Sequence, residues 1–268
     1  MRPDYVHGYD STESARLSDQ ARILEVLLHD ATRYPAGGAV LEAGCGTGAQ
    51  TLALLRRNPG VRLTCVDRSA DSLAEAEARI LAEGLPSPRF CRADLTALPF
   101  TEASFDHVFV CFVLEHMPEP DRALAEMRRV IKPRGTLTVV EGDNGSALFH
   151  PDDVRARAAI DCLVALQRAA GGDGLLGRRL YPLLDGAGFA DVAVTPRVAY
   201  ADAGRPDWAE GFVRRTFVAM VAGIREPAVA AGLIGADAFD AGLRALLRTT
   251  ERNGSFSYTF YRAVGRRP

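Results

Sequence analysis

The sequence contains few cysteines, and their spacing argues against a disulfide framework or a zinc site. Such sites appear as closely spaced pairs of cysteines. No such pair occurs among the five residues Cys45, Cys65, Cys91, Cys111 and Cys162. Several of them fall in apolar, strand-like runs, as the reduced thiols of cytoplasmic proteins do. We therefore expect a cytoplasmic protein with no disulfide and no bound metal.

The sequence also lacks an excess of charge and a long apolar run. Its formal net charge is −2 and its isoelectric point is about 6.2, which gives no bulk attraction to nucleic acid or to an anionic membrane. No apolar stretch is long enough to span a bilayer, and the first residues show no apolar signal core. Neither nucleic acid nor a membrane is therefore expected as a partner.

The sequence does provide material for a large core, since 47% of its residues are hydrophobic. Apolar runs typical of buried strands alternate with segments of helical period, and no internal repeat is visible. The expected strands lie at about residues 40–43, 61–67, 89–94, 105–113 and 136–141. Five strands separated by helices predict a doubly wound α/β sheet with right-handed crossovers.

The segments that flank this sheet have a different character. Helices are expected at residues 13–30, 152–170 and 173–187. A short strand at residues 192–195 is expected to stop at Pro196, because proline cannot donate a hydrogen bond to a sheet. Amphipathic helices then fill about residues 206–252, and the alternating aromatic and polar residues at 256–261 predict a last strand.

A glycine-rich turn, Gly44-Cys45-Gly46-Thr47-Gly48, follows the first expected strand. Glycine adopts the unusual backbone angles of a tight turn and, having no Cβ, lets the main chain approach a ligand at the positive end of the next helix. Asp67 ends the second strand about twenty residues later, where dinucleotide sites place a ribose-binding carboxylate. The pattern indicates a nucleoside site, with a purely structural turn and an ordinary loop acid as the alternatives.

Several motifs together carry a family resemblance. They are Glu42 to Gly48, Asp67, Ala93-Asp94-Leu95, Phe105-Asp106, Leu114-Glu115-His116 and Ile131-Lys132-Pro133-Arg134-Gly135. In this order and spacing they resemble class I S-adenosylmethionine-dependent methyltransferases, most of all the small-molecule branch related to the ubiquinone and menaquinone methyltransferases. The resemblance is dense over about residues 38–142.

The resemblance implies a Rossmann-like, seven-stranded, doubly wound α/β sheet whose final strand, at residues 255–262, runs antiparallel to the others. Residues 1–37 are then an N-terminal helical cap, and residues 38–268 form the methyltransferase domain. A helical insertion at about 206–252 separates the last two strands and is expected to act as a lid over the carboxyl edge of the sheet. The oligomeric state stays open, with a dimer among the alternatives.

The resemblance further implies a site for S-adenosylmethionine, whose product is S-adenosylhomocysteine. The glycine turn lies against the amino-acid end of this cofactor, Asp67 holds the ribose hydroxyls and Asp94 accepts from the adenine amine. The N-terminal segment with Tyr5 is expected to fold over the cofactor, with a surface turn as the alternative. The expected cofactor-binding residues are Tyr5, Glu42, Gly44, Gly46, Asp67, Arg68, Asp94, Leu95, Cys111, Phe112 and His116.

The expected function is methyl transfer to a small, largely apolar organic acceptor in secondary metabolism. Oxygen is favoured as the accepting atom, and nitrogen, sulfur and carbon stay open. Acids and histidines at the carboxyl edge are the candidate bases, and no single base is expected to dominate; they are His116, Glu141, Asp143 and His150. Candidate pocket residues are Phe112, Phe149, Tyr181, Tyr200, Trp208, Phe212 and Tyr258.

Two other classes of function are alternatives. A nucleotide-dependent oxidoreductase uses the same first turn and an acid like Asp67, but the sequence has no catalytic Tyr-x-x-x-Lys pair. A non-catalytic regulatory protein that binds the cofactor is the second alternative, and the intact motifs argue against it.

Replacing Asp67 by alanine is expected to lower the affinity for S-adenosylmethionine at least about tenfold. Each hydrogen bond from a ribose hydroxyl to the carboxylate contributes about 1.5–3 kcal/mol, and about 1.4 kcal/mol corresponds to a factor of ten. Calorimetric titration of the folded variant measures this loss. Unchanged affinity would remove Asp67 from the site.

Overall fold

The computed structural model describes residues 23–268, so Tyr5 and most of the expected N-terminal cap lie outside the described residues. Residues 23–29 are helical, in agreement with the helix predicted at 13–30. Leu24 and Leu28 on this helix are fully buried, as the apolar spacing of the sequence predicts.

Within residues 23–268 the sheet has eight strands, of which the first five run parallel. Its order is β3-β2-β1-β4-β5-β8-β6, with β7 paired to β8 as well. β8 runs antiparallel to β5, β6 and β7, which confirms the expected antiparallel last strand. The strands are β1 (Ala39–Ala43), β2 (Arg62–Asp67), β3 (Arg89–Arg92), β4 (Phe105–Cys111), β5 (Ile131–Gly142), β6 (Leu148–His150), β7 (Ala190–Asp202) and β8 (Ser255–Arg266).

Two strands differ from the prediction. β6 has only three residues, too few for an alternating pattern, so seven strands were expected where eight are found. The expectation that the strand at 192–195 stops at Pro196 is wrong, because β7 continues to Asp202 and Pro196 pairs with Tyr261. Among the described residues β7 pairs with β8 alone, and an edge strand accommodates a proline that donates no hydrogen bond.

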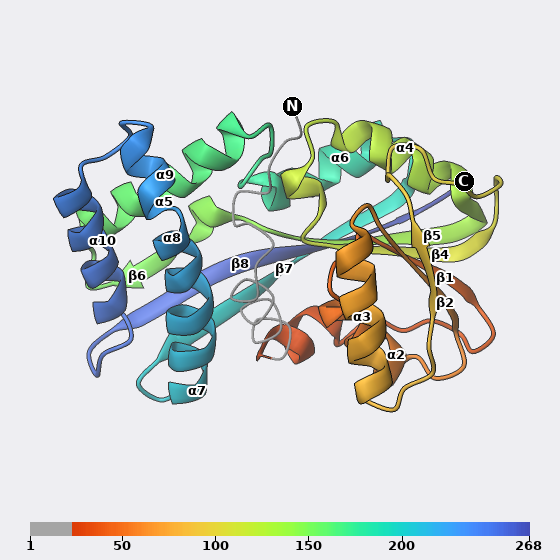
Figure 1. The fold of residues 1–268 in the computed structure, drawn as a ribbon, viewed down its shortest axis with the longest axis horizontal. Helices are drawn as coiled ribbons and strands as arrows, with labels where there is room; N and C mark the ends of the chain where they lie inside the picture. Colours follow the sequence, from red (N-terminus) through yellow and green to blue (C-terminus); the bar gives the residue numbers. More distant parts are fainter. Residues whose placement is uncertain (1–22) are drawn as a thin grey trace.

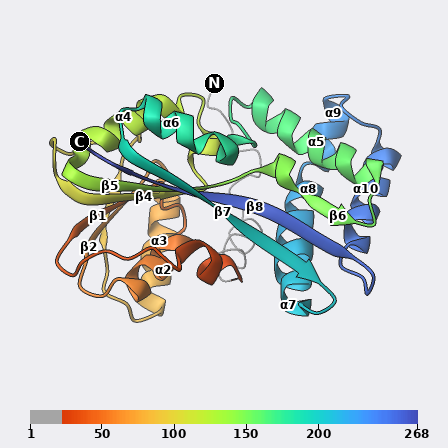
Figure 2. The same ribbon diagram turned by 180° about the vertical axis from the view of Figure 1, so that it is seen from behind.

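Helices cover both faces of the sheet, α4 and α6 on one and α2 and α3 on the other (Figures 1 and 2). The side chains of β4 alternate between two cores, since Phe109 packs in the core with Leu54 and Leu73 of α2 and α3, whereas Val108 and Val110 pack in the core of α4 and α6. These helices are α2 (Ala49–Arg57), α3 (Ala70–Ala82), α4 (Pro120–Val130) and α6 (Leu180–Gly186). The continuous apolar run of β4 is thus explained by burial on both faces.

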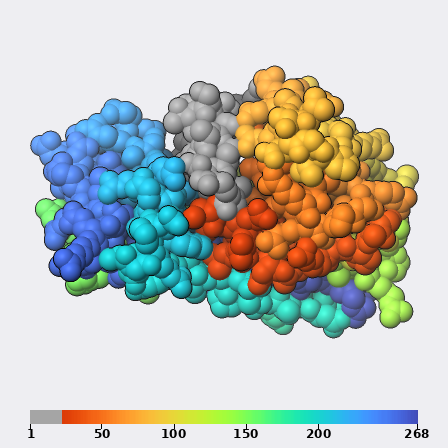
Figure 3. Space-filling model, turned by 90° about the horizontal axis from the view of Figure 1, so that it is seen from below, coloured from red at the N-terminus to blue at the C-terminus, as the bar shows by residue number. Residues whose placement is uncertain are grey.

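The insertion between β7 and β8 is helical, as expected. It contains α7 (Pro206–Trp208), the π-helix η4 (Ala209–Val218), α8 (Ala219–Gly223), α9 (Arg225–Ala230) and α10 (Ala236–Arg248). Seen from below, the insertion and the segment of α2 and α3 form opposite ends of the surface (Figure 3). α10 packs on α5 (Val154–Ala169). None of the helices in residues 23–268 is long and apolar enough to cross a membrane.

Gly242 allows α10 to approach α5 closely, and its replacement by alanine is expected to destabilise the fold. A Cβ on Gly242 would lie 2.5 Å from the carbonyl oxygen of Arg155 and 3.0 Å from the Cβ of Ala159. Overpacking of this kind costs about 1–3 kcal/mol, although alanine is the better helix former. Urea denaturation measures the change in the free energy of unfolding.

Gly223 provides a matched control within the same insertion. A Cβ there has no neighbour within 4 Å, so Gly223→Ala should leave the stability unchanged or raise it slightly. Equal stability of the two variants would contradict the close packing of α10 on α5.

Candidate active site

The glycine turn after β1 is crowded at two positions and open at the third. Gly44, Gly46 and Gly48 have positive φ angles of 75°, 51° and 80°. A Cβ on Gly44 would lie 2.6 Å from Cγ2 of Val113, and one on Gly48 would lie 2.9 Å from the Cβ of Ala76. Among residues 23–268, a Cβ on Gly46 would have no neighbour within 4 Å. The turn therefore leaves free space beside the backbone of Gly46, where a ligand can approach.

Asp67 is part of the same turn through two hydrogen bonds. Its Oδ2 accepts from the backbone N–H of Gly46 at 2.9 Å, and its Oδ1 accepts from the N–H of Ser69 at 2.9 Å. The side chain is half-buried at the end of β2. A carboxylate has about four acceptor sites, so two of them are still available to the hydroxyls of a sugar.

Glu42 lies below the turn and is almost fully buried. Its Oε2 accepts from the hydroxyl of Thr51 at 2.6 Å and from the thiol of Cys65 at 3.4 Å. Burial raises the pKa of Glu42 from 4.5 to about 7, against the opposing effect of these two hydrogen bonds. The side chain therefore changes its charge near neutral pH.

The residues expected around adenine lie where β3 ends. Asp94 is exposed, and its Oδ1 accepts from both the backbone N–H and the hydroxyl of Thr96, at 2.8 and 2.7 Å. These bonds lower the pKa of Asp94, so the side chain stays a carboxylate that accepts hydrogen bonds. Leu95 is 8% exposed and packs in the core of α4, and Arg68 is exposed. Their contacts with adenine stay a prediction.

The turn after β4 is held by Glu141 of the neighbouring strand. Oε1 of Glu141 accepts from the N–H groups of Val113 and Leu114 at 3.1 and 2.8 Å. Its Oε2 has no hydrogen-bond partner among residues 23–268. Burial, followed by the nearby charge of Glu115, raises the pKa of Glu141 well above its usual range. The two hydrogen bonds that Oε1 accepts place Glu141 as a support for the turn.

The remaining candidate bases have different environments. Asp143 is buried and forms a bidentate ion pair with Arg178, at 2.6 and 2.8 Å. His150 is exposed on β6, outside the lining of the cavity described below. His116 lies with Nε2 3.3 Å from Oε1 of Glu115. The structure therefore places His116 beside Glu115, which lines the cavity, commits Asp143 to an ion pair and leaves His150 apart.

The end of β4 separates the core from the cavity: Cys111 lies in the core, and Phe112 lines the cavity. Cys111 belongs to the core, and burial raises the pKa of its thiol well above the ordinary value. Phe112 has a positive φ of 57° and its N–H donates to the carbonyl oxygen of Val140 at 2.9 Å. Its ring lies 5.5 Å from that of Phe260, so Phe112 faces the neighbouring cavity.

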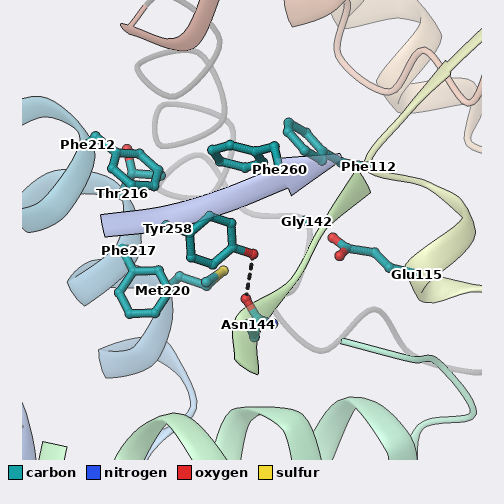
Figure 4. A pocket seen from close by; sticks show the side chains of 10 residues that line it. All are labelled: Phe112, Glu115, Gly142, Asn144, Phe212, Thr216, Phe217, Met220, Tyr258 and Phe260. Atoms are coloured by element: carbon teal, nitrogen blue, oxygen red, sulfur yellow. Dashed lines mark hydrogen bonds between the residues drawn. The ribbon is translucent and has the colours of Figure 1, made fainter. Parts of the chain in front are cut away.

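Beside this turn lies a small cavity, about 40 Å³ in volume, between the sheet and the insertion (Figure 4). Pockets for drug-sized ligands usually measure about 300–1,000 Å³, so this conformation accommodates only a small chemical group. The residues that line it are Phe112, Glu115, Gly142, Asn144, Phe212, Thr216, Phe217, Met220, Tyr258 and Phe260.

Three of the seven aromatic residues expected in the acceptor pocket line this cavity, namely Phe112, Phe212 and Tyr258. The others do not line it; Phe149 packs near Phe256, Trp208 packs near Phe212, and Tyr181 and Tyr200 are exposed.

The sequence reasoning missed Phe217 and Phe260. Phe260 follows from the alternation of β8, because residues 256, 258 and 260 share one buried face. In an α-helix with 3.6 residues per turn, two residues that are five positions apart lie on different faces. An α-helix therefore does not predict that Phe217 faces the same cavity as Phe212. In the π-helix η4 the hydrogen bonds join residues five apart, so Phe212 and Phe217 both face the cavity.

A glycine also shapes the floor of the cavity. A Cβ on Gly142 would lie 2.5 Å from the hydroxyl oxygen of Tyr258, so the hydroxyl fits only because Gly142 has no side chain. This hydroxyl donates to Oδ1 of Asn144 at 3.0 Å, and Nδ2 of Asn144 donates to Gln167 at 2.8 Å. In the sequence, only the polar turns at residues 142–145 and 171–174 point to this buried hydrogen-bond network.

Comparison with known proteins agrees with this geometry. The methyltransferase domain family matches residues 41–139. A demethylmenaquinone methyltransferase from Thermus thermophilus is 30% identical over 161 residues, which cover 49% of this chain and 73% of that protein. An uncharacterized 37.1 kDa protein in transposon TN4556 of Streptomyces fradiae is 32% identical over 223 residues, which cover 82% of this chain and 63% of that protein.

Among solved structures, the [4+2]-cyclase SpnF superimposes with a TM-score of 0.58 and 22% identity, over 92% of this chain and 80% of that one. At this identity the likeness shows the fold alone. The chain spans 63%, 52% and 56% of the length of the first three curated relatives that it matches.

The raised pKa of Glu42 predicts that this residue makes the fold less stable as the pH increases. The folded state keeps the proton up to a pH of about 7, whereas the unfolded chain releases it near 4.5. Stability should therefore fall between these two values, by up to about 3 kcal/mol at roughly 1.4 kcal/mol per unit. Glu42→Gln should remove this contribution to the decrease in stability between pH 4.5 and pH 7.

Urea denaturation at pH 5 and pH 8 tests the prediction by comparing the variant with the wild type. Glu83→Gln serves as a surface control, because Glu83 is 44% exposed in an ion pair with Arg56. The same pH dependence in the wild type and in Glu42→Gln would contradict the assignment.

Proposed function

The chain belongs to the S-adenosylmethionine-dependent methyltransferase family, and on this premise we propose that it transfers a methyl group from S-adenosylmethionine to a small organic acceptor. The free space beside Gly46 is the observation that carries the proposal. A Cβ there would meet no atom of the described part of the chain within 4 Å, and the carboxylate of Asp67 is hydrogen-bonded to the same residue. Gly44, Gly46 and Asp67 would hold the cofactor, with Asp94 and Leu95 at its adenine end.

The acceptor cavity adjoins this cofactor region. Val113 packs against Gly44, and the preceding residue, Phe112, lines the cavity. Because the cofactor region and the cavity are adjacent, we expect the acceptor and the methyl group of the cofactor to meet at the end of β4. When bound, S-adenosylmethionine supplies an activated methyl group, so the protein contributes mainly by orienting the reactants and excluding water, effects that reach about 7–11 kcal/mol.

The acceptor is a small molecule with apolar surface, because aromatic side chains enclose the cavity. The sequence favours oxygen as its reacting atom and secondary metabolism as its setting, with the cytoplasm as the compartment. The family argues against the nucleotide-dependent oxidoreductase. Formation of S-adenosylhomocysteine in the presence of an acceptor separates an enzyme from a regulatory protein that binds the cofactor without turnover.

Replacing Gly46 by alanine is expected to weaken cofactor binding while the protein stays folded. The new methyl group meets no atom of residues 23–268 within 4 Å, so the stability cost is that of a positive φ, about 1–2 kcal/mol. It does occupy the space of the ligand. We expect the affinity for S-adenosylmethionine, measured by calorimetry, to fall at least about tenfold.

Gly84 is the matched control, because it too has a positive φ, of 64°, and free space around its Cβ position. It lies just after α3, away from the turn. Gly84→Ala should lose similar stability and bind the cofactor normally. Equal cofactor affinity in both variants would refute the proposed binding site.

A further inference from the structure

The walls of the small cavity in Figure 4 are largely aromatic. Met220 and five rings surround it; the rings are Phe112, Phe212, Phe217, Tyr258 and Phe260. The faces of aromatic rings attract cations, and cages of such rings recognise ammonium groups. Among the residues of the described chain that line the cavity there is no lysine, arginine or histidine. Nothing in this lining repels a cation.

One carboxylate faces the aromatic cavity. The side chain of Glu115 is 13% exposed, and its carboxylate end points toward the cavity beside Phe112 and Gly142 (Figure 4). Asp143 is paired with Arg178, and neither Asp143 nor Glu141 lines the cavity, whereas Glu115 does, with His116 beside it at 3.3 Å. Glu115 is therefore the carboxylate that the lining presents. Burial, and next the charge of Glu115, raises the pKa of Tyr258 well above normal.

The hydroxyl donors that line the cavity are already engaged, and so is one of the two N–H groups of the Asn144 amide. The hydroxyl of Tyr258 donates to Asn144, and Nδ2 of Asn144 donates to Gln167. The hydroxyl of Thr216 donates to the carbonyl oxygen of Gly211 at 2.9 Å. A phenolate or carboxylate acceptor would need donors or cations here, because a buried anion without partners is costly. The cavity is therefore suited to a cation and unsuited to an anion.

We propose that this cavity takes the ammonium group of a secondary or tertiary amine, and that the nitrogen of this amine is the atom that is methylated. The proposal rests on the proposed function and names its acceptor class, with nitrogen in place of the oxygen that the sequence favours. A cavity of about 40 Å³ suits a small head group of this kind.

The residues around the ammonium group provide the proton transfer that the reaction needs. The carboxylate of Glu115 takes one proton from the ammonium and frees the electron pair of nitrogen. His116, 21% exposed and 3.3 Å from Glu115 through its Nε2, connects this carboxylate to solvent. The nitrogen–methyl bond forms as the methyl–sulfur bond breaks, and sulfur keeps the electron pair. The products are the methylated ammonium, S-adenosylhomocysteine and one proton.

A pair of isosteric probes tests the cation preference. Choline and 3,3-dimethylbutan-1-ol have the same shape. Choline has a positively charged nitrogen where the alcohol has a neutral carbon. With the full chain saturated by S-adenosylhomocysteine, choline should bind at least about tenfold more tightly in calorimetric or NMR titrations. Equal affinity, tighter binding of the alcohol, or no binding of either probe overturns the proposal.

Two variants locate the source of that preference. Glu115→Gln removes the charge at the cavity and should abolish most of the advantage of choline. Glu119→Gln is the control, because Glu119 is 57% exposed and paired with Arg122 at 2.9 Å, and it should keep the full advantage. An unchanged preference in Glu115→Gln would overturn the role of Glu115. If this variant does not fold, the comparison of the two probes in the wild type still decides the proposal.

Turnover provides the second readout. N,N-dimethylalkylamines and primary alcohols of equal chain length are offered with S-adenosylmethionine, and the release of S-adenosylhomocysteine is measured. Only the amines should react, and Glu115→Gln should lower their rate by about 10²–10⁴, as for a lost general base. Reaction of the alcohols, or of neither series while calorimetry shows S-adenosylmethionine binding, overturns the proposal. Absence of S-adenosylmethionine binding instead refutes the proposed function itself.

Discussion

The carboxyl group of Glu141 connects the two halves of the candidate site. Its Oε1 accepts from Val113 and Leu114 and so fixes the turn after β4 against β5. The side chain of Val113 fills the space that Gly44 leaves open. Two residues further on, Gly46 is hydrogen-bonded to Asp67. A continuous set of contacts therefore crosses β5, β4, β1 and β2, and the position of each loop depends on its neighbour.

Burial determines the environment of Glu141. A buried carboxylate carries a large desolvation penalty, which raises the pKa of Glu141 well above its usual range. Oε1 accepts from two N–H groups, whereas Oε2 has no partner among residues 23–268. Glu115, which follows the neighbouring strand β4, lines the cavity, whereas Glu141 supports the turn.

The sequence predicts the parts of this protein that local patterns determine. The strand before Asp67 and the glycine turn are short-range features, and the structure contains both of them. The course of β7 past Pro196 was predicted wrongly, because it depends on the position of that strand at the edge of the sheet. Glu115 and Asn144 were missed as lining residues for a related reason, since their role depends on where β8 and the insertion pack.

The insertion determines the acceptor end of the site because it shares a core with the sheet. Phe212 and Phe239 of the insertion belong to the same hydrophobic core as Leu54 of α2 and Phe109 of β4. Close-packed cores transmit displacements instead of absorbing them. A shift of η4 that widens the cavity must therefore be accommodated by side chains next to β4, whose end carries Phe112. In the proposed acceptor site, packing in the insertion would therefore set the size of the acceptor, and Glu115 after β4 would set the charge that it prefers.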